Sequence, residues 1–232
     1  MPLAIDLFCG LGGWTDGLLA EGYDVIGFDI ERHEYGEHRY PAQLVVQDVC
    51  TLHGSQFKDA ALIVASPPCQ EYSYMAMPWS LAKAKAKAIR EDTTGEKLAA
   101  LNRLFDQCFR IQREASLAAG YPIPLVVENV KGAQPWVGRA RWSFGSFYLW
   151  GDVPALMPIT FKAQKVPGFR FDDGSGALSG VKGSEGYERD HPNAFGWKKP
   201  GTSSHSPKRK FPSAMIAKIP LPLSRHIAAT FR

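Results

Sequence analysis

The chain has 232 residues, of which 45% are hydrophobic and 22% charged, and its formal net charge is +4. These values indicate a globular protein with one α/β domain, or one domain and a small appendage. The sequence contains no apolar run of eighteen residues and no signal-peptide pattern at its start, so we expect a cytoplasmic protein without a membrane span.

The positive charge is concentrated in the C-terminal third. Residues 151–232 hold 13 Lys and Arg against 6 Asp and Glu, a net charge of +7, whereas residues 1–150 have a net charge of −3. This excess suggests contact with a polyanion, although a solvated basic surface is the commoner explanation. The four cysteines form no C-x-x-C pair and the six histidines form no ligand pattern. Neither disulfides nor a metal site is therefore expected.

The first predicted elements are a strand over residues 3–8, a glycine turn with Gly10, Gly12 and Gly13, and a helix. Glycines let the backbone approach a ligand closely, and the start of the helix favours the anionic end of a nucleotide-like ligand. The turn is equally consistent with a tight connection that binds nothing.

Two acids follow the next strands. The strand over residues 23–29 ends in Asp29, about twenty residues after the turn, where a carboxylate can accept hydrogen bonds from ribose hydroxyls. Glu31 is the second candidate for this contact with the ribose. The strand over residues 44–46 leads to Asp48, which lies where the sheet would meet an adenine amine. Each acid alone could be a helix cap or a loop charge, but three polar strand ends indicate one nucleoside-like ligand.

A fourth apolar strand is predicted over residues 61–65. It ends before Pro67 and Pro68, so Cys69 lies in the loop that follows. Loops at such strand ends carry chemistry, so Cys69 is a candidate nucleophile. The alternative is that Cys69 is a small buried hydrophobe, the usual fate of a free cysteine.

Two helices are predicted next. Residues 80–90 are rich in helix formers and are opened by a capping serine, Ser80. Their three alternating lysines spread around the helix and either follow a phosphate backbone or are solvated. Residues 95–119 have apolar positions at spacings of three and four, with Gly120 as the C-cap, which indicates a helix that covers the core.

The fifth buried strand, over residues 125–130, contains Glu128 near its end. Burial should raise the pKa of this acid and suit it to hold or donate a proton. Farther on, Arg139 and Arg141 are two residues apart in an extended segment, so they face the same side and either hold an anion together or edge an exposed strand. Aromatic, strand-like residues follow at 142–150.

We divide the chain into a domain over residues 1–150, a glycine-punctuated region over residues 151–212, and a C-terminal segment over residues 213–232 that regains a helical pattern. The middle region is predicted to recognise nucleic acid, with lysines for phosphates and polar side chains for bases. An insertion without specific function is the alternative. The last segment is expected to pack back on the sheet.

Four motifs resemble, in order and spacing, those of the cytosine-C5 DNA methyltransferases: Asp6–Gly13, Pro67–Ser73, Glu128–Val130 and Arg139–Arg141. The resemblance covers residues 3–150 and implies a Rossmann-like methyltransferase sheet with helices on both faces, which binds S-adenosylmethionine, and a short, loop-rich target-recognition region. It implies a substrate of double-stranded DNA. The compact form is similar to solitary methyltransferases of phages or prophages, by analogy alone, and this implies a bacterial or phage-infected cell.

The resemblance also implies roles for single residues. Cys69 would add to C6 of a flipped cytosine, and Glu128 would bond to or protonate N3. Arg141, with Arg139, would hold O2 of the base and the glutamate, and Asn129 would order the strand end. The implied cofactor-binding residues are Phe8, Gly10, Leu11, Gly12, Gly13, Asp29, Ile30, Asp48, Val49 and Pro67. The expected DNA contacts are Gln70, Ser73, Lys198, Lys199, Lys208, Arg209 and Lys210.

Two departures from the family pattern leave alternatives open. The C-terminal segment lacks the family's Gly-Asn motif, so its way of closing the cofactor site is not defined, and the recognition region is short, which favours a short target or help from residues 74–94. A tRNA cytosine-5 methyltransferase and a non-catalytic DNA-binding regulator are the competing functions. A monomer is favoured.

Overall fold

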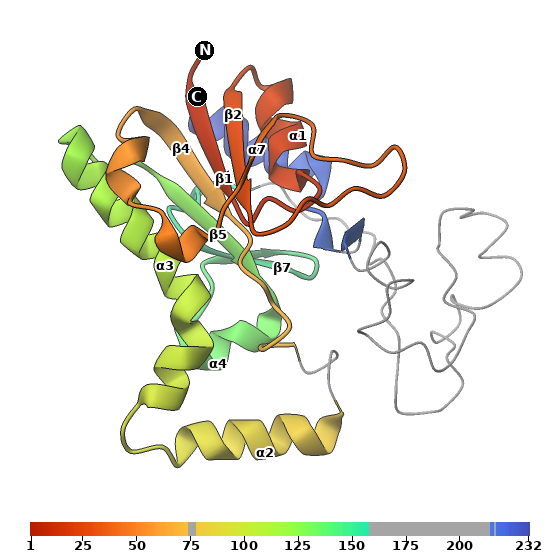
Figure 1. Cartoon of the computed structure of the whole chain (residues 1–232), viewed down its shortest axis with the longest axis vertical. Coiled ribbons are helices and arrows are strands. Elements are labelled where there is room, and N and C mark those ends of the chain that lie inside the picture. The colour runs from red at the N-terminus through yellow and green to blue at the C-terminus, as the bar shows by residue number, and fades with distance from the viewer. Residues whose placement is uncertain (74–77, 158–213, 216) are drawn as a thin grey trace, which may run out of the picture.

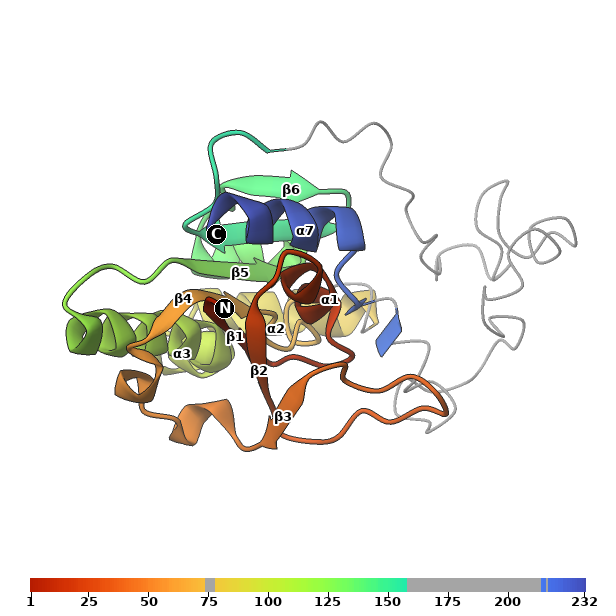
Figure 2. The same cartoon turned by 90° about the horizontal axis from the view of Figure 1, so that it is seen from above.

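The computed structural model describes residues 1–73, 78–157, 214–215 and 217–232. They form a seven-stranded sheet with the order β3-β2-β1-β4-β5-β7-β6 (Figures 1 and 2). The five parallel strands are β1 (Leu3–Leu7), β2 (Asp24–Asp29), β3 (Gln43–Val46), β4 (Ala60–Ala65) and β5 (Leu125–Asn129). The strands β6 (Trp142–Phe144) and β7 (Phe147–Gly151) form an antiparallel hairpin beside β5.

The strand order positions the site. Counted from β1, the sheet grows toward β2 on one side and toward β4 on the other, so the connections after β1 and β4 leave in opposite directions. Ligands of open α/β sheets bind in the crevice that this switch opens at the carboxyl ends of the strands. The Gly10 turn follows β1 and Cys69 follows β4, so both motifs lie at this crevice.

Helices cover both faces of the sheet, as expected. The described helices are α1 (Gly13–Ala20), α2 (Trp79–Arg90), α3 (Glu96–Ala119), α4 (Gln134–Val137) and α7 (Leu221–Thr230), with short 3-10 turns η1 (Val49–Thr51), η2 (Gly54–Phe57) and η4 (Lys131–Ala133). The core on one face joins Ile63 and Val127 to Phe105 and Ile111 of α3. The core on the other face belongs to α1 and α7. None of the helices in these ranges is long and apolar enough to cross a membrane.

Two local predictions need correction. Residues 142–150 form a hairpin and not one strand, because Gly145 adopts a φ of 62° and turns the chain. Ser80 does not cap α2: the helix begins one residue earlier, at Trp79, and its N-cap is Pro78 with a φ of −57°. Proline is accepted there because its φ is already fixed near the helical value and its missing N–H has no partner to lose. Gly120 is the C-cap of α3, as predicted.

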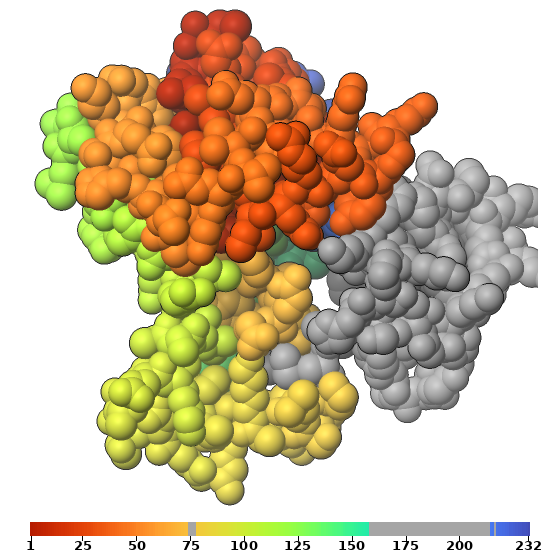
Figure 3. Space-filling view, viewed as in Figure 1, coloured from red at the N-terminus to blue at the C-terminus, as the bar shows by residue number. Residues whose placement is uncertain are grey.

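Helix α2 stands apart from the sheet. Figure 3 shows it with the first turns of α3 in a lobe distinct from the surface of residues 1–65, and Ala82 is its only buried residue. Lys85 pairs with Glu71 of the loop after β4, and the guanidinium of Arg90 lies 5.4 Å from the centre of the Trp136 ring on α4. These contacts, with the buried Ala82, connect α2 to the rest of the chain.

The C-terminal segment packs back on the sheet through α1. Two glycines, Gly13 and Gly17, lie four residues apart on α1, and a Cβ at either would overlap the backbone of the C-terminal segment, near Ile219 and Ser224 respectively. Two ion pairs flank this contact, Lys218–Asp16 and Arg225–Glu21, both at 2.7 Å. The approach of Ile219 to Gly13 places the segment against the first residue of α1, so the C-terminal segment supports the glycine turn without a Gly-Asn motif.

We expect the variant Gly17→Ala to lower the free energy of unfolding by about 1–3 kcal/mol, even though alanine favours a helix by about 1 kcal/mol. The added Cβ must push α7 away from α1. Urea unfolding measures this change, and Ala20→Ser, on the exposed side of α1, is the control that should leave stability nearly unchanged. Equal stability of Gly17→Ala and the wild-type protein would contradict the close packing.

Candidate active site

The turn after β1 is built by the backbone. Gly10 and Gly12 have φ values of 51° and 74°, and Phe8, which is not a glycine, has a φ of 56°. A non-glycine residue in this region is strained, and such strain is commonly found at functional sites. A Cβ on Gly10 would meet no atom within 4 Å, so the turn faces open space. The absent side chain therefore leaves room for a ligand against the backbone.

Asp29 closes the turn from the end of β2. Its carboxylate accepts hydrogen bonds from Gly10 N at 2.9 Å and Ile30 N at 2.8 Å, and His33 Nε2 lies 3.4 Å away. Burial raises the pKa of Asp29, but the hydrogen bonds from His33 and from Gly10 N–H outweigh it and the pKa is lowered. Asp29 is therefore an anion at the edge of the crevice. The next side chain, Ile30, is 71% exposed and offers an apolar surface beside it.

Asp48, the acid that follows β3, is the N-cap of a short helical turn. Its Oδ1 accepts a hydrogen bond from Cys50 N at 2.9 Å and so caps η1, whose first residue, Val49, is buried. A helix cap was one of the two interpretations of this acid. It does not conflict with a cofactor contact, because the cap uses one of the two carboxylate oxygens.

Asp6, Thr15 and Tyr40 form a buried polar cluster beneath the turn, which was not predicted from the sequence. Thr15 Oγ1 donates to Asp6 Oδ2 at 2.7 Å and lies 2.6 Å from the hydroxyl of Tyr40. Asp6 is fully buried, its Oδ1 has no partner among the described residues, and burial raises its pKa well above the ordinary value. In the sequence Asp6 only interrupts an apolar run, and the sole signal was that a strand otherwise buried on both faces contains an acid.

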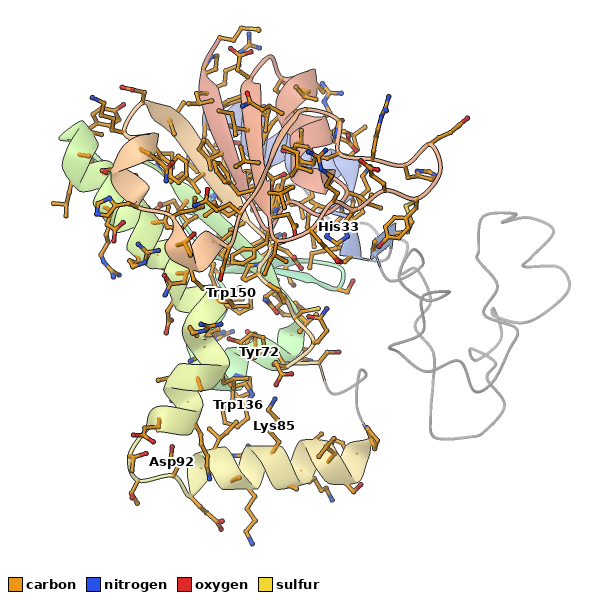
Figure 4. All side chains as sticks on the ribbon, in the orientation of Figure 1. His33, Tyr72, Lys85, Asp92, Trp136 and Trp150 are labelled. Atoms are coloured by element: carbon orange, nitrogen blue, oxygen red, sulfur yellow. The ribbon has the colours of Figure 1, made fainter. Side chains whose placement is uncertain are left out.

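The loop after β4 holds Cys69 from both sides. Asn129 Nδ2 donates to Pro67 O at 2.9 Å, so the end of β5 fixes the first proline. Beyond the cysteine, the N–H groups of Tyr72 and Ser73 both donate to Cys69 O at 3.0 Å, and the Tyr72 hydroxyl reaches Asn102 of α3 at 3.1 Å. Figure 4 shows Tyr72 between the sheet and Lys85 of α2. The cysteine thus sits in a short, anchored turn.

Glu128 and Cys69 are electrostatically coupled. Burial, followed by the nearby Glu128 carboxylate, raises the pKa of the Cys69 thiol to about 11. Burial also raises the pKa of Glu128 to about 8, although a hydrogen bond from Ser66 opposes the rise. The predicted elevation of the Glu128 pKa is therefore confirmed. At neutral pH both groups carry their protons, so Glu128 can act as a proton donor and does not repel the sulfur.

Arg139 and Arg141 do not join this pair. Trp142 is paired with Leu149, and Leu149 with Glu128, so Arg141, one residue before Trp142, projects from the opposite face of the sheet. Both arginines line an open cavity of about 620 Å³ beside α3 and α4. Their predicted common side is correct, but their predicted contact with Glu128 is not formed. The alternation of a strand defines a shared face without saying which face it is.

The expected DNA contacts are only partly within the described residues. Gln70 is exposed and Ser73 half-buried, and both flank the Cys69 turn. Five others lie outside the described residues, namely Lys198, Lys199, Lys208, Arg209 and Lys210. Most of the predicted recognition region, from residue 158 onward, also lies outside them.

Three solved structures resemble parts of the chain. A DNA modification methyltransferase encoded within an E. coli prophage is 25% identical over 57% of this chain and 33% of its own, with a TM-score of 0.38. The Dnmt2 methyltransferase of S. pombe is 16% identical over 59% and 37%, with a TM-score of 0.36. The methyltransferase EhMeth of Entamoeba histolytica is 18% identical over 60% and 41%, with a TM-score of 0.36. The matched part thus spans about a third to two fifths of these proteins.

No curated protein matches the chain. The family described as C-5 cytosine-specific DNA methylase matches residues 3–135, which is more than half of the sequence and contains the turn after β1, the Cys69 loop and Glu128. The chain therefore belongs to the family of C-5 cytosine-specific DNA methylases.

Proposed function

We propose that the protein transfers a methyl group from S-adenosylmethionine to C5 of a cytosine flipped out of double-stranded DNA, through a covalent bond between Cys69 and C6. The observation that carries this proposal is the meeting of Cys69 and a protonated Glu128 at the ends of two neighbouring strands, beside the open glycine turn. A nucleophile and an acid on one edge are what activation of a cytosine ring requires.

The described residues fit the cofactor. Gly10 leaves open space in front of the turn, Asp29 presents a carboxylate for ribose hydroxyls, and the exposed Ile30 offers an apolar surface for a purine ring. We assign the remaining contacts to residues around this crevice: Phe8, Leu11, Gly12, Gly13, Asp48, Val49 and Pro67. S-adenosylmethionine would supply an electrophilic methyl group there.

The raised pKa values of Cys69 and Glu128 mean that both groups start the reaction with their protons. The Cys69 thiol has to release its proton as sulfur bonds to C6, and water at the half-exposed loop can accept it. Glu128 gives its proton to N3 of the base, so the ring does not accumulate a full negative charge and C5 becomes an enamine-like nucleophile. After methyl transfer, water accepts the C5 proton, Cys69 is eliminated as the thiolate and takes a proton back from water, and N3 returns its proton to Glu128.

The nucleic acid is assigned from the family description and from charge. The matching family is one of DNA methylases, and the C-terminal third of the chain carries a net charge of +7, suited to a polyanion. We assign phosphate and base contacts to the region over residues 151–212, with Gln70 and Ser73 beside the flipped base. Transfer to tRNA, and DNA binding without catalysis, are outcomes of the test.

We expect duplex DNA in which every cytosine is replaced by 5-fluorocytosine to form a covalent complex with the protein when S-adenosylmethionine is present. The fluorine cannot leave as the C5 proton does, so the adduct between Cys69 and C6 persists. Denaturing gel electrophoresis detects the complex, and mass spectrometry of its peptides locates the bond. Using fully substituted DNA removes the need to know the target sequence.

Three outcomes would change the proposal. An adduct that forms only with fluorinated tRNA would move the substrate to RNA. A protein that methylates ordinary DNA but never forms the adduct would exclude the covalent mechanism. DNA binding without methylation of either nucleic acid would indicate a non-catalytic regulator. Cys69→Ser, which keeps the size of the side chain, is the matched control and should form no adduct.

A further inference from the structure

We propose that Trp14 and Ser66 form a partly buried hydrogen-bonded link between the glycine turn and Glu128, in which Ser66 is the positioning residue for the carboxyl of Glu128. The proposal rests on the proposed function for its catalytic meaning. The link itself is a property of the fold and is measurable without catalysis.

The geometry of the link begins at the turn. Trp14 is the second residue of α1, directly after Gly12 and Gly13, and its side chain is 2% exposed. Its indole Nε1 donates to Ser66 Oγ at 3.0 Å. Ser66 extends β4 by one residue through a bond from its N–H to Leu7 O at 3.1 Å. The serine is thus held by its backbone and by the indole at once.

The donors and acceptors define the direction of the link. An indole N–H can only donate, so Ser66 Oγ must accept from Trp14. The single hydroxyl proton of Ser66 is then left for the next partner. Ala65 is paired with Val127 across the sheet, so the next residues, Ser66 and Glu128, lie side by side on the same face, and the Ser66 hydroxyl lowers the pKa of Glu128. A donor directed at a carboxylate favours its charged form, so this bond counteracts the burial that keeps Glu128 protonated.

Among the described residues, no other ionisable group explains this effect, because burial and Ser66 are the two causes that act on the pKa of Glu128. The neighbours on this face of the sheet are apolar or neutral, and they are Trp14 and Thr15 of α1, Leu149 of β7, and Leu223, Ser224, Ile227 and Ala228 of α7. Within the described part of the chain, the titratable groups on this face are Cys69 beside Glu128, Asp6 two strands away, which Thr15 engages, Tyr40 at Thr15, and Tyr23, whose hydroxyl donates to Ala228 O. At the rim, Asp16 and Lys218 pair with each other at 2.7 Å.

The link joins two parts of the reaction. The turn proposed to hold the cofactor leads into Trp14, and Trp14 orients the serine that orients the acid. Removing the hydroxyl with Ser66→Ala leaves Glu128 without its donor and the buried indole N–H without its acceptor. We therefore expect Glu128 to titrate at a higher pH and to lose its fixed orientation.

The experiment is a carbon-13 NMR titration of the glutamate carboxyls, with the Glu128 signal identified by its absence in Glu128→Gln. Relative to the wild-type protein, we expect Ser66→Ala to titrate about one pH unit higher. Ser66→Thr, which keeps a hydroxyl, should titrate as the wild-type protein does. Trp14→Phe should shift the titration less than Ser66→Ala, because the hydroxyl remains but is no longer fixed.

Methyl transfer is then measured against pH for the same variants. The alkaline fall in rate should move upward by the same amount in Ser66→Ala and return in Ser66→Thr. An unchanged Glu128 titration in folded Ser66→Ala would overturn the proposal, and if that variant fails to fold, a Trp14→Phe protein identical to the wild type would do so. If the titration depends on Ser66 but no variant methylates DNA or tRNA, the link stands and the proposed function falls.

Discussion

Replacing Cys69 with alanine is expected to reduce methyl transfer by roughly 10⁴-fold or more, because no other described group can add to C6 from the same position. Glu128, the adjacent group, is an acid kept protonated by burial, and the neighbouring Ser66 is engaged by Trp14. Without the covalent bond, C5 of cytosine remains too weak a nucleophile to accept a methyl group. The measurement is transfer of a labelled methyl group to DNA under single-turnover conditions.

The matched control is Cys108→Ala. This variant removes a thiol of α3 that is fully buried in the core between the helix and the sheet, so it should cost stability while the rate changes little. The Cys69→Ala protein should also keep the stability of the wild-type protein to within about 1 kcal/mol, since Cys69 is only half-buried. Full activity of Cys69→Ala would move the nucleophile elsewhere in the chain.

Glu128→Gln is expected to slow methyl transfer by about 10²- to 10⁴-fold, the usual contribution of a positioned proton donor. Glutamine has the same shape and can still accept from Ser66, but it has no acidic proton for N3. Single-turnover rates at pH 6 to 9 test this, and the wild-type rate should fall above pH 8 as Glu128 ionises. A glutamine variant with the wild-type rate would remove Glu128 from the mechanism.

The same substitution has a separate effect on stability. The pKa of Glu128 rises from an ordinary 4.5 to about 8 on folding, so the unfolded chain releases this proton at a lower pH than the folded protein. Stability from this group is full below pH 4.5 and is lost as the pH rises to 8. Relative to Glu128→Gln, the wild-type protein should lose up to about 4–5 kcal/mol over this range. Urea unfolding of both proteins at pH 5, 7 and 9 measures the difference, and parallel pH profiles would contradict it.

Much of the fold could be predicted because buried parallel strands need nearly continuous apolar runs. The predicted strands over residues 61–65 and 125–130 are such runs, and the bounds of each lie within one residue of the strand observed. Gly120 ends α3 as predicted because a left-handed residue at a helix end favours glycine. The prediction that Ser80 caps α2 was wrong. A serine at the second position of a helix looks the same in the sequence as a serine at the N-cap, one or two residues earlier.

The site was predictable where neighbouring strand ends carry distinctive residues, as at Cys69 and Glu128. It was not predictable where a contact depends on which face of the sheet a side chain occupies. Arg141 was expected at Glu128 but lies on the other face, since the hairpin at Gly145 sets the register of β6 against β7. The bond from Trp14 to Ser66 spans 52 residues and follows only from the packing of α1 on β4.

The packing of α7 against α1 bears on how target choice can change in such a protein. The chain leaves the sheet after β7 and returns to the same domain at α7, and Figure 2 shows α7 beside α1. In the sequence, the intervening residues are therefore an insertion between two elements that both pack on the same sheet. Closing a longer or shorter loop between fixed ends changes the free energy only slowly with length. Under the proposed function, exchange of this insertion between relatives would change the target sequence without altering the strands that carry Cys69 and Glu128.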